Sequence, residues 1–311
     1  MRSRFLSLST LFAASLIACL SANALADDAY RVEDTKGKHL DVLTPEGKPI
    51  MRYVYVREEG KEGRPTFDTA KVFAHVFADD GETMLTKGPG GKFPHHRGIF
   101  IGWKGIKHDG DRHDLWHVRN TEQRHEKFLK TDADAKGATV KSVIQWIGKP
   151  GKPVLEETRT LELIASDDAH ALIDMTSELK AVNGPVELNG DPEHAGCQFR
   201  PSQKVAENKS AKYTFHAEGI DPKKVRDLPW VAETFTIDGQ QWSVQLMRAP
   251  SNPEGARWSA YRDYGRFGPF AVAKIEDGQT LPLRYRFRVT KGPAPSRESM
   301  QKAYEAFVAS L

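Results

Sequence analysis

The sequence has little cysteine, no strong excess of charge of either sign and only one long apolar run. Its 45 Lys and Arg residues nearly balance 42 Asp and Glu residues, which leaves a formal net charge of +3. That balance lacks the basic footprint of a nucleic-acid-binding protein, so we expect no nucleic-acid partner. The apolar run, Phe5 to Leu20, is N-terminal. A protein with several membrane spans is therefore excluded, and we expect no transmembrane span in the mature chain.

Several motifs of well-known chemistries are also absent. The chain has no Walker loop, no Gly-x-Gly-x-x-Gly, no Gly-x-Ser-x-Gly, no EF-hand loop and no His-Glu-x-x-His. These absences argue against nucleotide chemistry and serine hydrolysis. The composition that remains, 39% apolar and 28% charged, is that of an ordinary globular protein.

The N-terminal residues 1–26 have the features of a secretory signal peptide. Arg2 and Arg4 precede the apolar run, and Ala24-Leu25-Ala26 offers small residues at the cleavage site. We therefore expect a periplasmic or secreted protein cleaved after Ala26. The alternative is a lipid anchor at Cys19, because Leu16 to Cys19 resembles a bacterial lipobox. After cleavage at Ala26 only Cys197 remains, so the fold has no internal disulfide.

The rest of the chain, residues 27–311, is predicted to be all-β. Runs rich in β-branched and aromatic residues recur between turn signals. The best hairpin pairs Phe235–Ile237 with Gln240–Leu246 around Asp238-Gly239, which suits a type I′ turn. The other predicted strands are Ile50–Arg57, Val72–Phe77, Ile99–Trp103, Thr139–Ile147, Leu155–Ile164, Ala171–Leu179 and Leu281–Val289. Many short strands without a linker predict one large antiparallel β-sandwich domain.

A single helix is predicted, over 296–311. Ser296 can cap it, and Met300, Tyr304, Phe307 and Leu311 form an apolar stripe at helical spacing. We expect this stripe to pack on the sandwich.

Histidine is concentrated in one part of the chain. Six of the 11 histidines lie between residues 95 and 125, and histidine suits both proton transfer near neutral pH and metal binding. His95 and His96 precede an apolar strand and can share one site only if the backbone there is irregular. The spacing of four places His113 and His117 on one face of a helix or a strand.

Two further segments combine polar and aromatic residues. In the segment 193–200, His194 lies in a loop, and Gln198 and Arg200 share a strand face. In the segment 258–268, aromatic rings alternate with Arg and Asp, which suits stacking on a sugar and hydrogen bonding to its hydroxyl groups. The same composition suits a structural Arg–Asp corner. The carboxylate candidates for acid–base work are Glu156, Glu157 and Asp263.

These motifs together resemble those of the secreted "PmoA family" of uncharacterised bacterial proteins. The motifs are Pro94–Gly98, Asp114–His117, Gly196–Arg200 and Tyr261–Gly268. The family name implies a methane oxygenase subunit, which we reject because that protein needs several membrane spans. The resemblance implies a supersandwich similar to galactose mutarotase and a setting among secreted glycan-processing proteins. It also implies that His95, His96, His117 and His194 correspond to mutarotase-like acid–base histidines.

The sequence thus predicts an exported carbohydrate-active protein, leaning towards an enzyme of epimerase, lyase or hydrolase type, whose substrate is a carbohydrate or another small polar molecule. One or two of the four histidines would transfer protons with Glu157 or Asp263. No cofactor is required. Substrate-binding candidates are Arg97, Trp103, Gln198, Arg200, Trp258, Tyr261 and Arg262. Two alternatives stay open. One is a metal-dependent enzyme with a divalent metal on His95, His96, His117 and His194, and the other is a non-catalytic glycan-binding protein.

Overall fold

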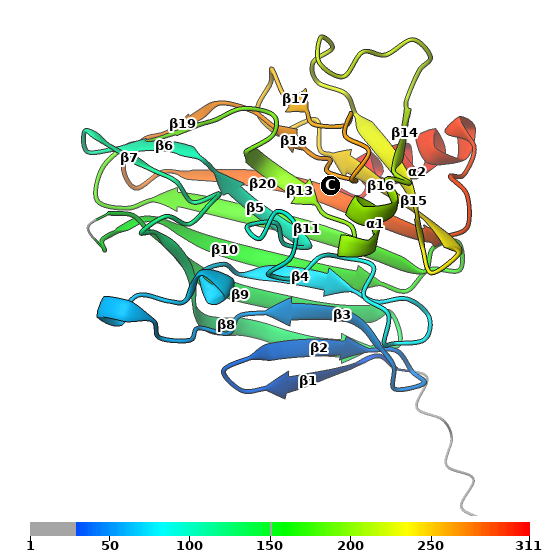
Figure 1. Ribbon diagram of the computed structural model, residues 1–311, viewed down its shortest axis with the longest axis horizontal. Helices are drawn as coiled ribbons and strands as arrows, with labels where there is room; N and C mark the ends of the chain where they lie inside the picture. Colours follow the sequence, from blue (N-terminus) through cyan, green and yellow to red (C-terminus); the bar gives the residue numbers. More distant parts are fainter. Residues whose placement is uncertain (1–28, 150) are drawn as a thin grey trace, which may run out of the picture.

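The computed structural model describes residues 29–149 and 151–311, and its strands form two large antiparallel sheets (Figure 1). The predicted signal peptide lies outside the described residues. The first sheet has six strands, in the order β1 (Arg31–Thr35), β2 (His39–Leu43), β3 (Pro49–Val54), β4 (Phe73–Val76), β5 (Ile99–Trp103) and β13 (Ala195–Phe199). The second has eight, in the order β14 (Lys212–Phe215), β15 (Trp230–Ile237), β16 (Gln240–Arg248), β20 (Thr280–Lys291), β11 (Ala171–Ala181), β10 (Pro153–Ile164), β9 (Gly137–Ile147) and β8 (Glu122–Asp134).

Smaller elements complete the fold. A four-stranded sheet has the order β19 (Ala273–Ile275), β12 (Val186–Asn189), β6 (Gly105–His108) and β7 (Asp111–His113), and a two-stranded sheet joins β17 (Arg257–Trp258) to β18 (Pro269–Phe270). The helices are α1 (Gln203–Asn208) and α2 (Arg297–Ala309), and two 3₁₀ turns span Lys61–Gly63 and Phe67–Thr69. Within 29–149 and 151–311, no helix is long and apolar enough to cross a membrane.

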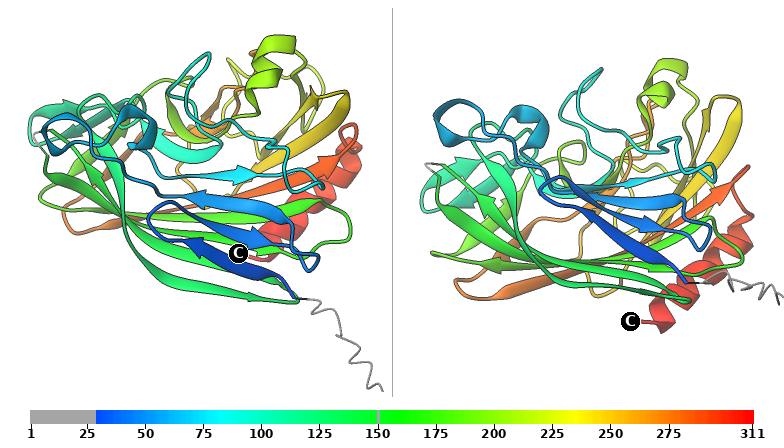
Figure 2. Two further views of the ribbon diagram at one scale, coloured as in Figure 1. Left: turned by 60° about the horizontal axis from the view of Figure 1, so that its bottom comes forward. Right: turned by 90° about the horizontal axis from the view of Figure 1, so that it is seen from below.

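The two large sheets pack face to face as a sandwich. Alternation along each strand sends every second side chain inward, so Ile99 and Ile101 of β5 share an apolar core with Ile144 of β9 and Phe287 of β20. Figure 2 shows the two layers, with α1 and several long turns on the side of the six-stranded sheet that faces away from the second layer. The predicted antiparallel sandwich is confirmed.

The hairpin and the C-terminal helix also form as predicted. Asp238 and Gly239 have φ of 50° and 81°, the positive values that a type I′ turn needs. The Ser296 side chain caps α2 by accepting a hydrogen bond from the Ser299 amide at 3.2 Å. Met300 and Phe307 are buried against the eight-stranded sheet. The stripe does not extend to Leu311, which is exposed because α2 ends at Ala309.

Candidate functional site

The polar segments singled out in the sequence meet on the outer face of the six-stranded sheet. On β5, Phe100 points away from the main core and joins Phe73 and Trp116 in a separate apolar cluster. Strands β5 and β13 pair antiparallel, so the segment before β5 lies beside the segment after β13. The Arg200 amide accordingly donates to the Gly98 carbonyl at 3.0 Å.

The turn before β5 is held by Arg97. Its guanidinium is buried and donates to four carbonyl oxygens, those of Pro94 (2.5 Å), His96 (2.8 Å), Phe67 and Asp68 (both 3.2 Å). These bonds keep the backbone irregular at this point. Arg97 therefore organises the loop, and we do not place it among the ligand-binding residues.

Because of that irregular turn, His95 and His96 lie side by side. Their ring centroids are 4.6 Å apart with the planes at 88°. His96 is buried and stacks on Phe93 at 5.0 Å, whereas His95 is partly exposed. Burial, followed by the nearby charge of Lys71, lowers the pKa of His95 to about 3. Burial also holds the pKa of His96 well below its usual range. Both rings are therefore neutral at pH 7.

His117 forms a tight pair with Asp114. The His117 Nδ1 and Asp114 Oδ2 atoms are 2.8 Å apart, and Asp114 Oδ1 accepts from the backbone amides of Trp116 (3.1 Å) and His117 (2.8 Å). Burial opposes ionisation of Asp114, but the hydrogen bonds from His117 outweigh it, and the pKa of Asp114 is lowered. The carboxylate thus fixes both the turn and the ring.

His194 forms the same kind of pair with Asp191. His194 Nδ1 lies 2.8 Å from Asp191 Oδ1, and Lys104 Nζ lies 3.1 Å from Asp191 Oδ2. Burial opposes ionisation of Asp191 but is outweighed by the hydrogen bonds from Lys104 and His194, so its pKa is lowered. Burial lowers the pKa of His194, although Asp191 acts in the opposite direction.

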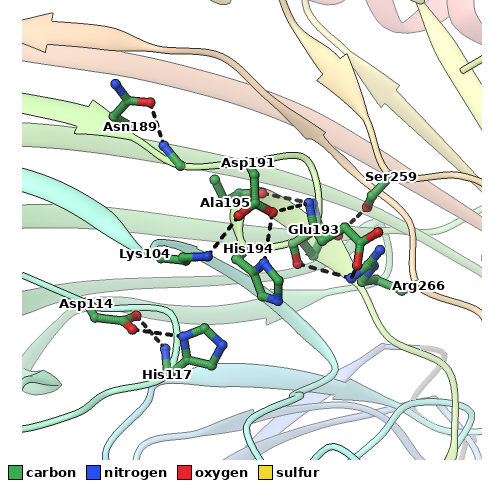
Figure 3. A network of polar contacts seen from close by, with 12 residues as sticks. Lys104, Asp114, His117, Asn189, Asp191, Glu193, His194, Ala195, Ser259 and Arg266 are labelled. Atoms are coloured by element: carbon green, nitrogen blue, oxygen red, sulfur yellow. Dashed lines mark hydrogen bonds and ion pairs between the residues drawn. The ribbon is translucent and has the colours of Figure 1, made fainter. Parts of the chain in front are cut away.

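The two Asp–His pairs lie side by side, and the His117 ring contacts both His95 and His194. Ring centroids are 4.6 Å apart for His95 and His117, and 5.1 Å apart for His117 and His194. Figure 3 shows the His117 and His194 rings reaching towards the same space from different chain segments. Their side chains are 17% and 27% exposed, so a ligand can reach them. We call His95, His117 and His194 the histidine cluster.

The carboxylates set the tautomers of the two rings. A carboxylate at these distances only accepts hydrogen bonds, so Nδ1 of His117 and of His194 carries a hydrogen. In the neutral form of each ring the lone pair is then on Nε2. Such a ring can accept a proton or bind a metal ion through Nε2.

A second network flanks the cluster and is centred on Glu193. Its carboxylate pairs with Arg266 Nη1 (2.8 Å) and Arg262 Nη2 (2.7 Å) and accepts from the Tyr261 hydroxyl at 3.0 Å. Burial opposes ionisation of Glu193, but the hydrogen bonds from Arg266 and Arg262 outweigh it and lower its pKa to about 2. Tyr261 and Arg262, both predicted to bind substrate, are thus anchored beside His194 with partly exposed side chains.

Glu157 lies elsewhere. It is 0% exposed in the sandwich interior, where its carboxylate binds Arg159 (2.7 and 2.8 Å), Trp146 Nε1 (2.8 Å) and Ser177 Oγ (2.7 Å). Its oxygens are saturated by these core partners, so Glu157 holds a core ion pair and is not available to a histidine. Glu156 is on the same strand, β10, paired with Lys180 and Gln145.

Two tryptophans predicted to stack on a ligand are core residues instead. Trp103 packs on Trp146 at 5.9 Å and belongs to the main core. Trp258 is fully buried, and its Nε1 donates to the Leu228 carbonyl at 3.2 Å. Neither ring offers a face to a ligand.

The remaining candidates occupy separate environments. Gln198 is buried and bonded to Ser259 Oγ (3.1 Å) and the Ala195 carbonyl (3.0 Å), which makes it structural. Asp263 is exposed in the turn before Arg266. The expectation that His113 and His117 share a face is wrong, because they flank an irregular turn. The buried His113 ring lies near His108 at 6.1 Å.

The described residues do not form a preassembled metal-binding site. Among the described residues, no group of three or more His, Cys, Asp or Glu side chains is placed to hold a metal ion. The carboxylate bonds at Nδ1 of His117 and His194 are nonetheless those commonly seen behind metal-binding histidines.

Sequence reasoning missed Asp114, Asp191 and Glu193 as site residues. A signal for the first two is present in the sequence, because Asp114-Leu-Trp-His117 and Asp191-Pro-Glu-His194 repeat the pattern Asp-x-x-His. The structure shows that this spacing closes a turn in which the carboxylate grips the histidine Nδ1. Glu193 gave no comparable signal, since its three partners are remote in the chain.

The chain belongs to a family described as "Family of unknown function (DUF6807)", whose sequence model matches residues 42–305. No curated protein sequence matches significantly. The finer resemblance to the PmoA family and to galactose mutarotase stays a prediction.

Solved structures of carbohydrate-active enzymes show a distant likeness. A heparan sulfate lyase HepC mutant from Pedobacter heparinus has 8% identity and a TM-score of 0.43, with 86% of this chain and 37% of that chain covered. A putative kojibiose phosphorylase from the human microbiome has 8% identity and a TM-score of 0.37, and the match covers 90% of this chain and 36% of that chain. The α-N-acetylgalactosaminidase NagBb from Bifidobacterium bifidum has 11% identity and a TM-score of 0.35, and the match covers 85% of this chain and 38% of that chain. The chain therefore spans little more than a third of these enzymes, and the likeness says nothing about its activity.

Proposed function

We propose that this member of the family is an exported enzyme that performs acid–base chemistry on a carbohydrate at the histidine cluster. The observation that carries the proposal is the pair of Asp–His units, each of which presents an Nε2 lone pair towards the same accessible space. Export rests on the predicted signal peptide at 1–26 with cleavage after Ala26.

In this proposal, one Asp–His unit acts as the general base and the other, once protonated, as the general acid. Asp114 and Asp191 hold the Nδ1–H bonds and stabilise the imidazolium that forms when Nε2 takes a proton. A positioned group of this kind contributes about 10²- to 10⁴-fold in rate. His95, a neutral ring in contact with His117, would orient the substrate by hydrogen bonding.

The surroundings suit a sugar better than an apolar ligand. Tyr261 is anchored to Glu193 with its ring partly exposed, and Arg262 lies 5.5 Å from that ring. Aromatic faces and planar guanidinium donors are the groups that bind sugar rings and hydroxyls. The predicted resemblance to secreted glycan-processing proteins points in the same direction.

A metal-dependent enzyme is the second candidate, and one observation favours it. Carboxylates on Nδ1 of His117 and His194 fix the tautomer that metal ligation through Nε2 requires. Elemental mass spectrometry on the untagged protein decides between the two. Stoichiometric metal that is lost in both His117→Ala and His194→Ala would favour this candidate, and protein without metal that is active would exclude it.

The test of the proposal is a turnover assay on a panel of mono- and oligosaccharides, in which proton NMR monitors the conversion of each sugar. We expect at least one sugar to be converted by the wild type and by His125→Ala, and not by His117→Ala or His194→Ala. His125 is the matched control because it is a partly buried histidine that hydrogen-bonds Tyr53, away from the cluster. Saturable sugar binding without any conversion would contradict catalysis and support a glycan-binding protein.

A further inference from the structure

Two buried cations lie beneath the histidine cluster. Lys71 Nζ is 5.7 Å from the centre of the Trp116 ring and 4.4 Å from that of Phe100, and the Arg200 guanidinium carbon is 5.4 Å from the Trp116 ring. Both residues are 1% exposed. Trp116, which directly precedes His117, thus links a charged floor to the cluster.

Neither side chain forms an ion pair within the described part of the chain, and burial lowers the pKa of both Lys71 and Arg200 well below their usual values. No carboxylate oxygen there lies within 4.0 Å of Lys71 Nζ or of any Arg200 nitrogen. Among the described residues, Lys71 donates only to the His95 carbonyl, at 2.8 Å. All three Arg200 side-chain nitrogens lack a hydrogen-bond partner among the described residues. Burying a charge without a partner is costly, so such groups are retained for a reason.

Arg200 differs from Arg97 in that its guanidinium forms, within the described chain, none of the hydrogen bonds by which a buried arginine usually stabilises the backbone. Arg97 is equally buried, and its guanidinium donates hydrogen bonds to four backbone carbonyl oxygens. The carboxylates nearest the cluster are also engaged: Asp114 by His117, Asp191 by Lys104 and Glu193 by two arginines. The Glu233 carboxyl group raises the pKa of Arg200, but both of its oxygens are buried without a hydrogen-bond partner among the described residues. Burial raises the pKa of Glu233 well above its usual value and so favours the uncharged carboxyl group.

The positive charge reaches the cluster. Lys71 and Arg200 are both among the charges that lower the pKa of His95, which touches His117. A low-dielectric interior screens such charges poorly, so they favour an anion placed against these rings.

We infer that the sugar bound at the histidine cluster is acidic, with its anionic group placed over the floor formed by Lys71, Trp116 and Arg200. This inference rests on the proposed function and narrows its substrate class. A carboxylate, as in a uronic acid, and a sulfate ester share the required negative charge, and the experiment separates them.

The test measures binding to the protein purified after export, by saturation-transfer NMR. The probes are D-galacturonate and D-glucuronate, their neutral parents D-galactose and D-glucose, and D-galactose 6-sulfate. We expect each uronate to bind at least about tenfold more tightly than its neutral parent, because the interior screens the attraction between the buried basic groups and an anion only weakly. Binding of the sulfate ester alone would assign the anion to sulfate rather than carboxylate.

Two variants test whether Arg200 causes the preference for acidic sugars. Arg200→Gln should weaken binding of the acidic sugar about tenfold and leave the neutral sugar unchanged. The matched control is Arg288→Gln, which removes another buried arginine, located on β20 and paired with Asp168. If Arg200→Gln does not fold, the comparison of acidic and neutral sugars on the wild type still decides.

Neutral sugars that bind as tightly as acidic ones would overturn this inference and leave the proposed function standing. Equal losses in Arg200→Gln and Arg288→Gln would overturn it as well. If no sugar of either class binds, the inference and the proposed function both fail.

Discussion

At the scale of single residues, the site depends on histidines that stay neutral. Burial is the first cause of the lowered pKa of His95, His96 and His194, because it disfavours the charged imidazolium. The same burial that keeps His95 neutral, and so able to accept a hydrogen bond, makes the folded protein sensitive to acid. His75 shows this most clearly, because it is buried on β4 with Nδ1 only 2.9 Å from Thr86 Oγ1.

The first prediction concerns acid stability. The pKa of His75 is about 4 and that of His95 about 3, both lowered from 6.5 by burial. A group with a lowered folded pKa contributes stability above its unfolded pKa and loses it as the pH falls through the folded one. The free energy of unfolding should therefore decline between pH 6.5 and about 4, by about 3 kcal/mol for His75 alone. Urea denaturation at a series of pH values measures this.

The variant His75→Gln serves as the comparison, because it retains a hydrogen-bonding side chain that does not titrate. Its stability should fall less steeply over the same range. A wild-type stability that stays level down to pH 4.5, where the carboxylates titrate, would contradict the prediction.

Single residues also show where sequence reasoning ends. The histidines His95, His117 and His194 could be chosen from the sequence because their density and loop positions are unusual. Trp103 and Glu157 could not be excluded, since their side chains are common in both sugar sites and cores. What separates the two roles is the direction of one side chain on a strand, which depends on tertiary pairing.

At the scale of elements, close packing of β13 against the β17–β18 hairpin holds the Glu193 network in place. Gly196 on β13 has φ of 85°, and a Cβ there would lie 2.0 Å from the Pro269 carbonyl oxygen. Gly239, in the β15–β16 turn, has nearly the same φ of 81° but nothing within 4 Å of a Cβ.

The second prediction uses these two glycines as a matched pair. Gly239→Ala should cost about 1–2 kcal/mol, the penalty of a left-handed backbone for a residue with a Cβ. Gly196→Ala should cost at least twice as much, because the clash with Pro269 adds to the same penalty. Urea denaturation of both variants measures the difference, and equal losses would show that β13 and the hairpin are not packed as described.

Elements differed in how well they could be predicted. The β15–β16 hairpin has a local signal, Asp-Gly between alternating apolar runs, and it formed as expected. Strand β8 was missed because it is an edge strand with many charged, exposed side chains and so lacks an alternating apolar pattern. Helix α1 was missed because it has only six residues and no side-chain cap.

At the scale of the whole molecule, the site exists because strands remote in sequence pair. The β5–β13 pairing brings Arg200 beside the turn that carries His95, and it brings Lys104 beside Asp191. Composition and periodicity predicted the sandwich, but they contain no information about which strands are neighbours. The histidines of the site, Tyr261 and Arg262 were therefore accessible from the sequence, whereas its carboxylates and its geometry were not.

The most direct measurement is a histidine-selective NMR experiment on the ¹⁵N-labelled protein at neutral pH. We predict cross-peaks between the ring protons of His117 and those of both His95 and His194, and a hydrogen on Nδ1 with a lone pair on Nε2 at His117 and His194. Rings without mutual cross-peaks, or a hydrogen on Nε2 with the lone pair on Nδ1, would contradict the assembled acid–base centre.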